Sequence, residues 1–245
     1  MFVDYVTRGV EAGLVAGLVF GLFVATVVNP MVGYAEAVGH GHDHDVAGHD
    51  HSGGEGVVSL AATETVSVLS GVLWAVLLGA VVFGVGFYLL EPLLPGSGRL
   101  RSYVLAAAGF VSVSGAPWLV LPPRPGVETA LPAATRLALY GGMMVAGALL
   151  CLLALVAYDR LRPRGRAVAL MVAGLALTPL AVPASLAPTP GVAGDLPPEL
   201  AAGLVGLIVF GQALLWLCLA ATHARLHTDR SHADAATSGD PVAAD

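Results

Sequence analysis

Six long runs of uncharged, mostly apolar residues divide the chain and constrain its fold more than any other feature. Each run is long enough to cross the ~30 Å hydrocarbon core of a bilayer, for which a helix needs about 20 residues. Backbone groups in lipid must find partners within the protein, and the runs do not alternate between apolar and polar residues as barrel strands do. They therefore predict helices, at residues 10–35, 66–90, 102–121, 137–158, 167–187 and 200–222.

The composition supports a protein that lives in lipid. Of 245 residues, 56% are hydrophobic and only 11% are charged, which is too apolar for a soluble domain of this length. The sequence thus predicts an all-α polytopic membrane protein with six transmembrane helices. Prolines interrupt the third and fifth spans, so we expect both to unwind near one membrane face.

The arginines indicate how these helices are oriented. If successive loops alternate between the two sides, only Arg124 and Arg136 fall on one side. The other side receives the remaining nine: Arg8, Arg99, Arg101, Arg160, Arg162, Arg164, Arg166, Arg225 and Arg230. Because cytoplasmic loops carry the excess of basic residues, we expect both termini in the cytoplasm of a plasma-membrane protein. Residues 36–64 then form an external loop, and residues 231–245, which are small and polar, a disordered cytoplasmic tail.

The external loop is rich in groups that bind metals. It holds five histidines and three aspartates, namely His40, His42, His44, His49, His51, Asp43, Asp45 and Asp50. Imidazole and carboxylate are ligands of divalent transition metals, and the intervening glycines leave the backbone free to wrap around an ion. Affinity order alone does not name the metal. The loop predicts a weak, exchangeable metal site, and the alternative is a polar connector whose histidines only add solubility.

Polar groups in or beside the spans are candidates for an ion pathway. Asn29, directly before Pro30, is the deepest, and Glu36 and Glu64 lie at span ends. A cation pathway and a simple proline kink both explain Asn29. His223 and His227 are four residues apart, so they share one helix face and could form a cytoplasmic exit site, or could anchor the helix at the interface.

Glycines repeat every fourth residue along the first span. Gly9, Gly13, Gly17 and Gly21 give one helix face without side chains, which predicts close packing against another helix. No motif of a nucleotide-binding loop, a metalloprotease or a serine hydrolase occurs. We therefore expect neither an enzyme nor a permanently bound cofactor, and no nucleic-acid partner.

The order of these signals resembles the predicted cobalt transporter subunit CbtA family. The resemblance rests on the first helix ending in Pro30 and Tyr34-Ala35-Glu36, the histidine loop, APWLVLPPRPG at Ala116–Gly126, Arg136 with Tyr140, and the stretch Leu196–Leu219. It implies a polytopic subunit of a cobalt uptake system that supplies cobalamin synthesis and works with a small single-span partner that also carries histidines. Cobalt as the ion and inward as the direction come from this resemblance.

Two other functions remain open on the residues alone. The chain could be a non-conducting assembly or metal-sensing subunit, whose glycine face holds a partner and whose loop reports external metal. It could also export Ni²⁺ or Zn²⁺, since efflux would use the same six spans in the opposite direction.

Overall fold

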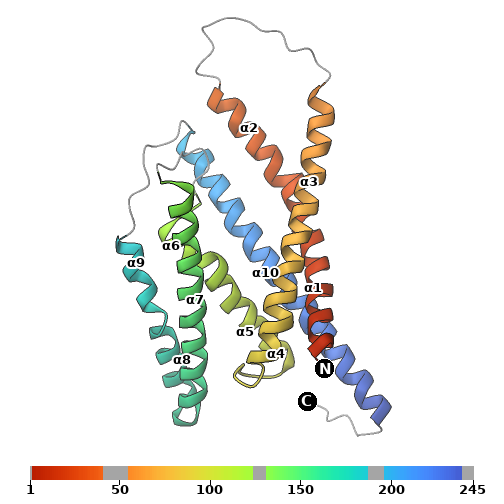
Figure 1. Ribbon diagram of the computed structural model, residues 1–245, viewed down its shortest axis with the longest axis vertical. Helices are drawn as coiled ribbons and strands as arrows, with labels where there is room; N and C mark the ends of the chain where they lie inside the picture. Colours follow the sequence, from red (N-terminus) through yellow and green to blue (C-terminus); the bar gives the residue numbers. More distant parts are fainter. Residues whose placement is uncertain (1, 41–54, 124–130, 187–195, 239–245) are drawn as a thin grey trace, which may run out of the picture.

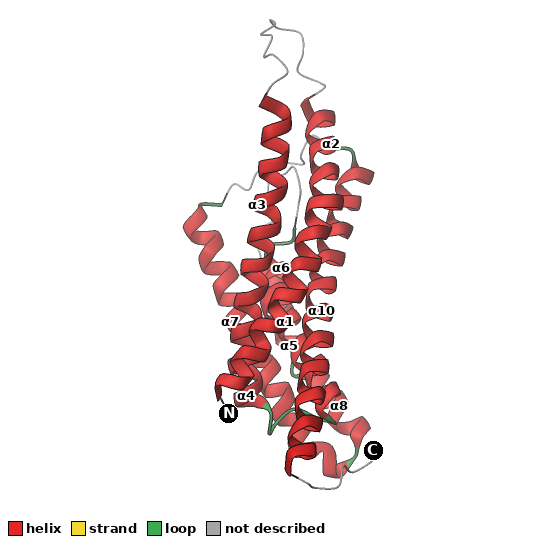
Figure 2. Cartoon of the chain, turned by 90° about the vertical axis from the view of Figure 1, so that its right-hand side faces the viewer, coloured by secondary structure: helices red, strands yellow, loops and turns green. Residues whose placement is uncertain are grey.

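The computed structural model describes residues 2–40, 55–123, 131–186 and 196–238, and within these ranges all regular structure is helical (Figures 1 and 2). The α-helices are α1 (Phe2–Phe23), α2 (Asn29–His40), α3 (Glu55–Leu78), α4 (Phe87–Leu90), α5 (Gly98–Phe110), α6 (Ala116–Val120), α7 (Ala133–Leu161), α8 (Arg166–Leu175), α9 (Ala181–Leu186) and α10 (Pro198–Ser238). Wider π-helical segments, η1 (Val24–Val28), η2 (Gly79–Gly86) and η3 (Val111–Gly115), join α1 to α2, α3 to α4 and α5 to α6.

Six helical stretches of the described part are long and apolar enough to span a membrane. They are Phe2–Ala35, Thr65–Leu90, Gly98–Val120, Ala133–Arg164, Arg166–Pro183 and Pro198–Thr228. The predicted all-α membrane fold with six spans is therefore confirmed. Leucines and valines at mid-span, such as Leu18, Leu73 and Leu149, are exposed, as expected for side chains that face lipid.

Two helices extend further than the hydropathy pattern indicated. The first begins at Phe2 rather than residue 10, because the polar side chains of its first turns find partners on other helices. α10 runs to Ser238, so helix covers residues 231–238 of the segment expected to be irregular. That part of α10 is rich in alanine, which favours helix.

Prolines lie at the interruption of the third span and at that of the fifth. α6 ends at Val120, immediately before Pro122 and Pro123. In the fifth span, α8 ends at Leu175 and a short 3-10 helix that contains Pro179 leads into α9. Each proline removes a backbone donor, so the regular α-helix is interrupted there.

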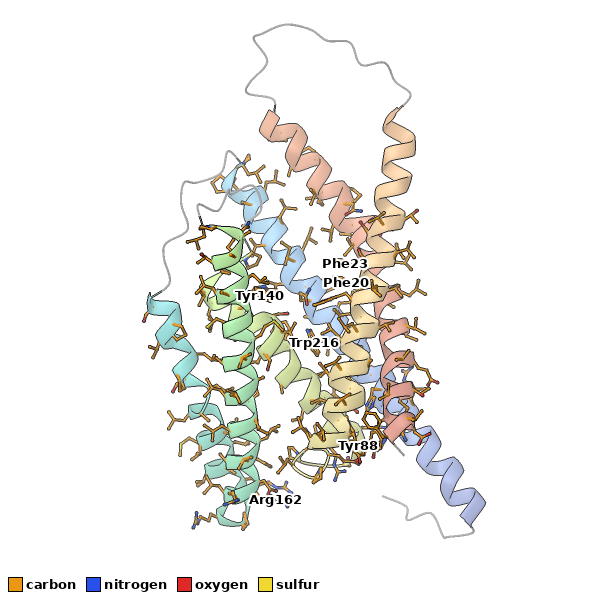
Figure 3. All side chains as sticks on the ribbon, viewed as in Figure 1. Phe20, Phe23, Tyr88, Tyr140, Arg162 and Trp216 are labelled. Carbon is orange, nitrogen blue, oxygen red and sulfur yellow. The ribbon has the colours of Figure 1, made fainter. Side chains whose placement is uncertain are left out.

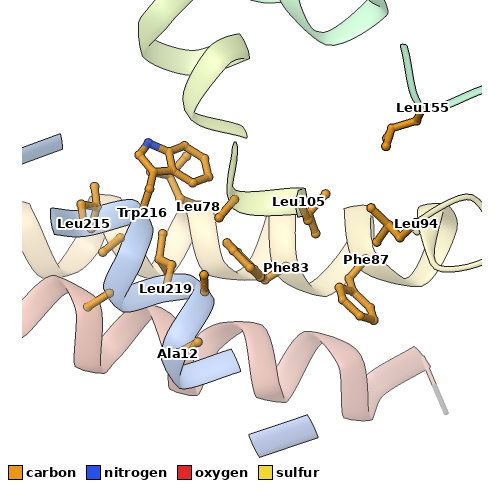
Figure 4. Packing of buried hydrophobic residues seen from close by; sticks show 14 residues of the cluster. Ala12, Leu78, Phe83, Phe87, Leu94, Leu105, Leu155, Leu215, Trp216 and Leu219 are labelled. Atoms are coloured by element: carbon orange, nitrogen blue, oxygen red, sulfur yellow. The ribbon is translucent and has the colours of Figure 1, made fainter. Parts of the chain in front are cut away.

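Four of the spans form a closely packed group. α1 packs along α3, η2 and α10, and α10 packs along α5. Their shared core contains Phe83, Phe87, Leu215, Trp216 and Leu219 (Figure 4). Gly109 of α5 makes room for the indole of Trp216, because a Cβ at this glycine would collide with the ring.

The remaining two spans, α7 and α8, lie beside this group rather than within it. α7 packs on α8, η3 and α6, and a separate small core joins Ala116, Val120, Met143 and Leu180. Tyr140 on α7 donates a hydrogen bond to the carbonyl oxygen of Val113 in η3, 2.8 Å away. α7 and α8 are thus held mainly by the α6 end of the bundle.

The chain reversals alternate between two ends of the bundle. One end carries the start of α1, the α4–α5 and α7–α8 turns and the last turns of α10 (Figure 1). All nine arginines that the sequence groups on one side belong to these elements, and we call this the arginine-rich end. The last turns of α2 and α9 and the first turns of α3 and α10 lie toward the opposite end (Figure 1).

Candidate functional site

The histidine-rich segment is attached at the end opposite to the arginine-rich end. α2 ends at His40 and α3 begins at Glu55, so residues 41–54 connect the tips of these two helices (Figure 1). His42, His44, His49 and His51, with Asp43, Asp45 and Asp50, lie outside the described residues, as does the side chain of His40. Within the described ranges, no group of three or more histidines, cysteines and acidic residues is close enough to hold a metal.

Asn29 marks the place where the first span changes its winding. The π-helical segment η1 ends there, and the Asn29 backbone N–H donates to the carbonyl of Val24. Pro30 follows and has no N–H to give, so the wider turn accommodates it without a break in the helix. The Asn29 side chain is half-buried, and its Nδ2 donates to Ser67 Oγ of α3 at 3.0 Å.

The two acidic candidates sit further along the same helices. Glu36 lies on α2 and Glu64 on α3, on the side of Asn29 and Ser67 that faces the histidine segment. Their side chains are outside the described residues. Along the chain, Glu36 lies between the segment and Asn29, and Glu64 lies between the segment and Ser67.

At the arginine-rich end, His223 and His227 of α10 lie inside the bundle. His223 is fully buried, and its ring lies against Phe83 and Phe87, with centroid distances of 5.1 and 4.7 Å. Its Nδ1 shares a hydrogen bond of 2.9 Å with Ser102 Oγ of α5. The two imidazole rings are nearly parallel, at 8° and 6.2 Å between centroids.

Arg8 of α1 holds His227 in place. Its Nη1 donates to His227 Nδ1 at 2.7 Å, so this ring nitrogen is an acceptor and carries no proton while the contact exists. Gly98 of α5 packs against the same ring, because a Cβ there would be 3.1 Å from His227 Cδ2. The ring of His227 on α10 therefore contacts both Arg8 of α1 and Gly98 of α5, so the three helices meet at this residue.

A second set of contacts joins α1 and α5 through Glu91, which follows α4. Tyr5 OH donates to one of its carboxylate oxygens at 2.5 Å, and Arg101 forms an ion pair with the other at 3.2 Å. Arg101 Nε also donates to the carbonyl of Gly96 in the α4–α5 turn. The Arg8 guanidinium lies over the Tyr5 ring, 4.9 Å from its centroid, which connects the two sets of contacts.

The geometry of this network bears on metal binding. Imidazole lone pairs lie in the ring plane, so two nearly parallel rings do not direct them onto one ion. Arg8 also occupies Nδ1 of His227 and adds a positive charge beside it. His223 Nε2 is buried and has no hydrogen-bond partner in the described part of the chain. A metal would therefore require Arg8 to move and the two rings to turn.

Sequence reasoning noticed the two histidines but not the network around them. Tyr5, Arg8 and Ser102 each looked like ordinary residues at the edge of a span. Their shared position at the arginine-rich ends of α1 and α5 is the signal that could have grouped them with Glu91. Their pairing depends on how the helices cross, and a single sequence does not specify this.

The glycine face of α1 lies directly on α3 and η2. All four glycines are buried. A Cβ at Gly13 would be 2.6 Å from Ala75 O, one at Gly17 would be 2.6 Å from Val72 Cα, and one at Gly21 would be 2.9 Å from Val68 Cα. Gly9 meets Gly79 in the same way. The two backbones touch along this line, with no side chains between them.

The chain was compared with known proteins. It matches no curated protein and no solved structure. A family model described as "Probable cobalt transporter subunit (CbtA)" matches residues 2–228, which include all six spans. The chain therefore belongs to the CbtA family of probable cobalt transporter subunits, as its motifs had indicated.

Proposed function

We propose that this chain captures Co²⁺ outside the cell with its histidine-rich segment and passes the ion inward through its helix bundle, as a subunit of a cobalt uptake system. The observation that carries the proposal is the position of that segment. It joins the tips of α2 and α3, at the end of the bundle remote from nine of the eleven arginines. Since arginine-rich ends face the cytoplasm, this arrangement supports an external segment.

The chemistry of the segment suits capture rather than permanent binding. Five imidazoles and three carboxylates on a glycine-rich backbone take up a divalent ion and release it again, because nothing in their spacing imposes a rigid ligand cage. Such a segment raises the local metal concentration at the mouth of the bundle. Cobalt as the transported ion follows from the family, and Ni²⁺ or Zn²⁺ would fit the same ligands.

From the segment, we propose that the ion passes Glu36 and Glu64 and then Asn29, before it leaves near His223 and His227. α2 and the first turns of α3 diverge toward their tips, which supports an entrance between them (Figures 1 and 2). At this proposed exit, Arg8 donates a hydrogen bond to His227. Inward release would require this bond to break.

A partner is part of the proposal, since the family is described as a transporter subunit. The chain has no nucleotide-binding loop, so the energy must come from a partner or from an ion gradient. We propose a small single-span protein that also carries histidines. It would bring further imidazole ligands to the outer end of the bundle.

Uptake kinetics test the capture step. Cells that express the chain are given radioactive cobalt, and all five loop histidines are replaced by asparagine. We expect the cobalt concentration for half-maximal uptake to rise at least tenfold, with the maximal rate unchanged, because capture precedes passage. Asn29→Ala should instead lower the maximal rate. A chain truncated after Arg230 is the control and should behave as the natural chain; unchanged uptake in the first two variants would refute the mechanism.

The orientation can be tested independently of transport. Ser52→Cys places a thiol in the histidine segment, and Ser97→Cys places one at an exposed position of the α4–α5 turn, at the arginine-rich end. A membrane-impermeant thiol reagent added to intact cells should label the first variant and leave the second unlabelled until the cells are lysed. The reverse pattern would exclude an external histidine segment.

One observation favours a second function, a non-conducting assembly or sensing subunit. α1 and α3 touch backbone to backbone along the glycine face, so an ion cannot pass between these two helices unless they separate. Reconstitution of the purified chain alone in liposomes distinguishes the two functions. Cobalt entry supports a conduit, and cobalt binding without entry supports the accessory role.

A further inference from the structure

We infer that the groove between α5, α7 and α8 is a binding site for an anionic phospholipid. Its acyl chains would lie in the groove and its phosphate against Arg162 and Arg166. The groove has a volume of about 840 Å³, within the ~300–1,000 Å³ typical of sites for small molecules. This inference is independent of the direction of metal transport.

The walls of the groove are apolar: α7 and α8 pack on each other, whereas α5 makes few contacts with either. α5 contributes Val104, Ala107 and Ala108, whereas α7 contributes Ala154 and Leu155. Small side chains on both walls leave the space open. On α8, Leu170 lines the groove and is 63% exposed, so the groove opens at the surface that faces lipid.

Basic residues gather only at one end of the groove. Arg162, with Arg166 and Tyr158, lines the groove. Figure 3 shows Arg162 where α7 turns into α8. Gly165 has a φ of +136°, a backbone conformation that glycine adopts without strain, and it reverses the chain between the two arginines. The turn therefore brings one guanidinium from each side of the reversal to the mouth of the groove.

The two arginines have charge available for a phosphate. Arg166 is exposed and forms no ion pair or hydrogen bond within the described part of the chain. Arg162 pairs with Asp159 at 3.2 Å, but its side chain is 58% exposed, and exposed pairs of this kind contribute little. Arg101, which follows the groove residue Leu100, is already paired with Glu91 and Gly96.

The chemistry of the groove selects the occupant. Basic sites between transmembrane helices on the arginine-rich side bind anionic lipid headgroups, and guanidinium groups match phosphate oxygens in a bidentate manner. The apolar walls suit acyl chains, and the two arginines at one end suit a phosphate, so one anionic phospholipid matches both parts of the groove.

The test uses the full chain, purified in an uncharged detergent and stripped of lipid, to which defined lipids are added. Dioleoyl-phosphatidylglycerol should bind and raise the melting temperature, whereas dioleoyl-phosphatidylcholine and glycerol 3-phosphate, which lack either the charge or the acyl chains, should not. In R162Q/R166Q, binding should weaken at least about tenfold, the factor expected for the loss of one charge-assisted hydrogen bond. The matched control is R160Q/R164Q, which removes the same charge from residues outside the groove, and it should bind as the natural chain does.

Three outcomes would overturn the inference. If lipid binding weakens equally in both double variants, the arginines act only through their overall charge. If the two lipids bind equally well, the headgroup plays no role. If glycerol 3-phosphate binds, the ligand is a soluble phosphate instead. In the membrane, a photo-reactive side chain at position 173, which lines the groove, should form an adduct with the mass of a phospholipid. An adduct with a second copy of the chain or with a partner helix would also overturn it.

Discussion

Replacing Gly13 by alanine should separate α1 from α3 and lower the free energy of unfolding. The new Cβ would lie 2.6 Å from Ala75 O and from Val76 Cα, where ordinary contacts begin at about 3.4 Å, so the helices must move apart by roughly 0.8 Å. A gap of this size forfeits about a quarter to a half of the dispersion energy of each contact along the seam. Overpacking of this kind costs about 1–3 kcal/mol.

The matched control is Gly142→Ala in α7. No atom lies within 4 Å of the Cβ position at Gly142, which is also at mid-helix in a spanning segment. Both variants gain the same intrinsic preference of alanine over glycine for the helix, about 1 kcal/mol. The difference between the two free energies of unfolding therefore isolates the steric cost, and we expect about 1–3 kcal/mol in favour of Gly142→Ala.

Unfolding of the purified chain in mixed micelles, as the fraction of dodecyl sulfate rises, provides the measurement. Helicity by circular dichroism follows the transition, and the midpoint of each variant is compared with that of the natural chain. Close packing matters here because helices in lipid associate through contact and not through the hydrophobic effect. Equal midpoints for the two alanine variants would refute this account of the glycine face.

Two further pairs of variants test the network at the arginine-rich end with the same titration. Ser102→Ala leaves Nδ1 of the buried His223 without its partner and should cost about 1–3 kcal/mol, whereas Ser70→Ala removes an exposed hydroxyl that bonds to the carbonyl of Ser67 in its own helix and should cost less than about 0.5 kcal/mol. Glu91→Gln weakens the ion pair with Arg101 and the hydrogen bond from Tyr5, and it should lower the free energy of unfolding by about 1 kcal/mol. Asp159→Asn breaks the exposed pair with Arg162 and should change the free energy of unfolding by less than about 0.5 kcal/mol. If the network variant and its control lower the free energy of unfolding equally in either pair, the network stabilises the fold no more than ordinary exposed contacts do.

The spans and the grouping of the arginines could be read from the sequence because both depend on local properties. Length and apolarity determine whether a segment crosses lipid, and the chain must return at each loop. The boundaries were less predictable. Asp4, Arg8 and Glu11 made the first turns of α1 look like a flanking segment, although Arg8 is satisfied by a histidine 219 residues away. A hydropathy window covers about 20 neighbouring residues, so it does not detect a partner this far along the sequence.

Small-residue spacing gave an ambiguous signal. Gly13 and Gly17 contact another backbone, yet Gly141, Gly142, Gly203 and Gly206, which also lie within spanning helices, have open space where a side chain would begin. The difference lies in which face another helix covers. The three π-helical segments were not anticipated either, since their wider turns arise from how each helix meets its neighbours and from Pro30.

The contacts of the described chain restrict how an ion could move through it. At the arginine-rich end, α1 is tied to α10 by Arg8 and to Glu91 by Tyr5, while α5 is tied to α10 by Ser102. Opening between any two of these helices breaks at least one of the bonds, and each bond that involves a charged group contributes about 1.5–3 kcal/mol. At the other end, α2 and α3 diverge and are joined in the described part by the uncharged pair of Asn29 and Ser67. The end that carries the tips of α2 and α3 is therefore the less costly one to open, and in the proposed orientation inward release would be the slower step of a conduit built on this bundle.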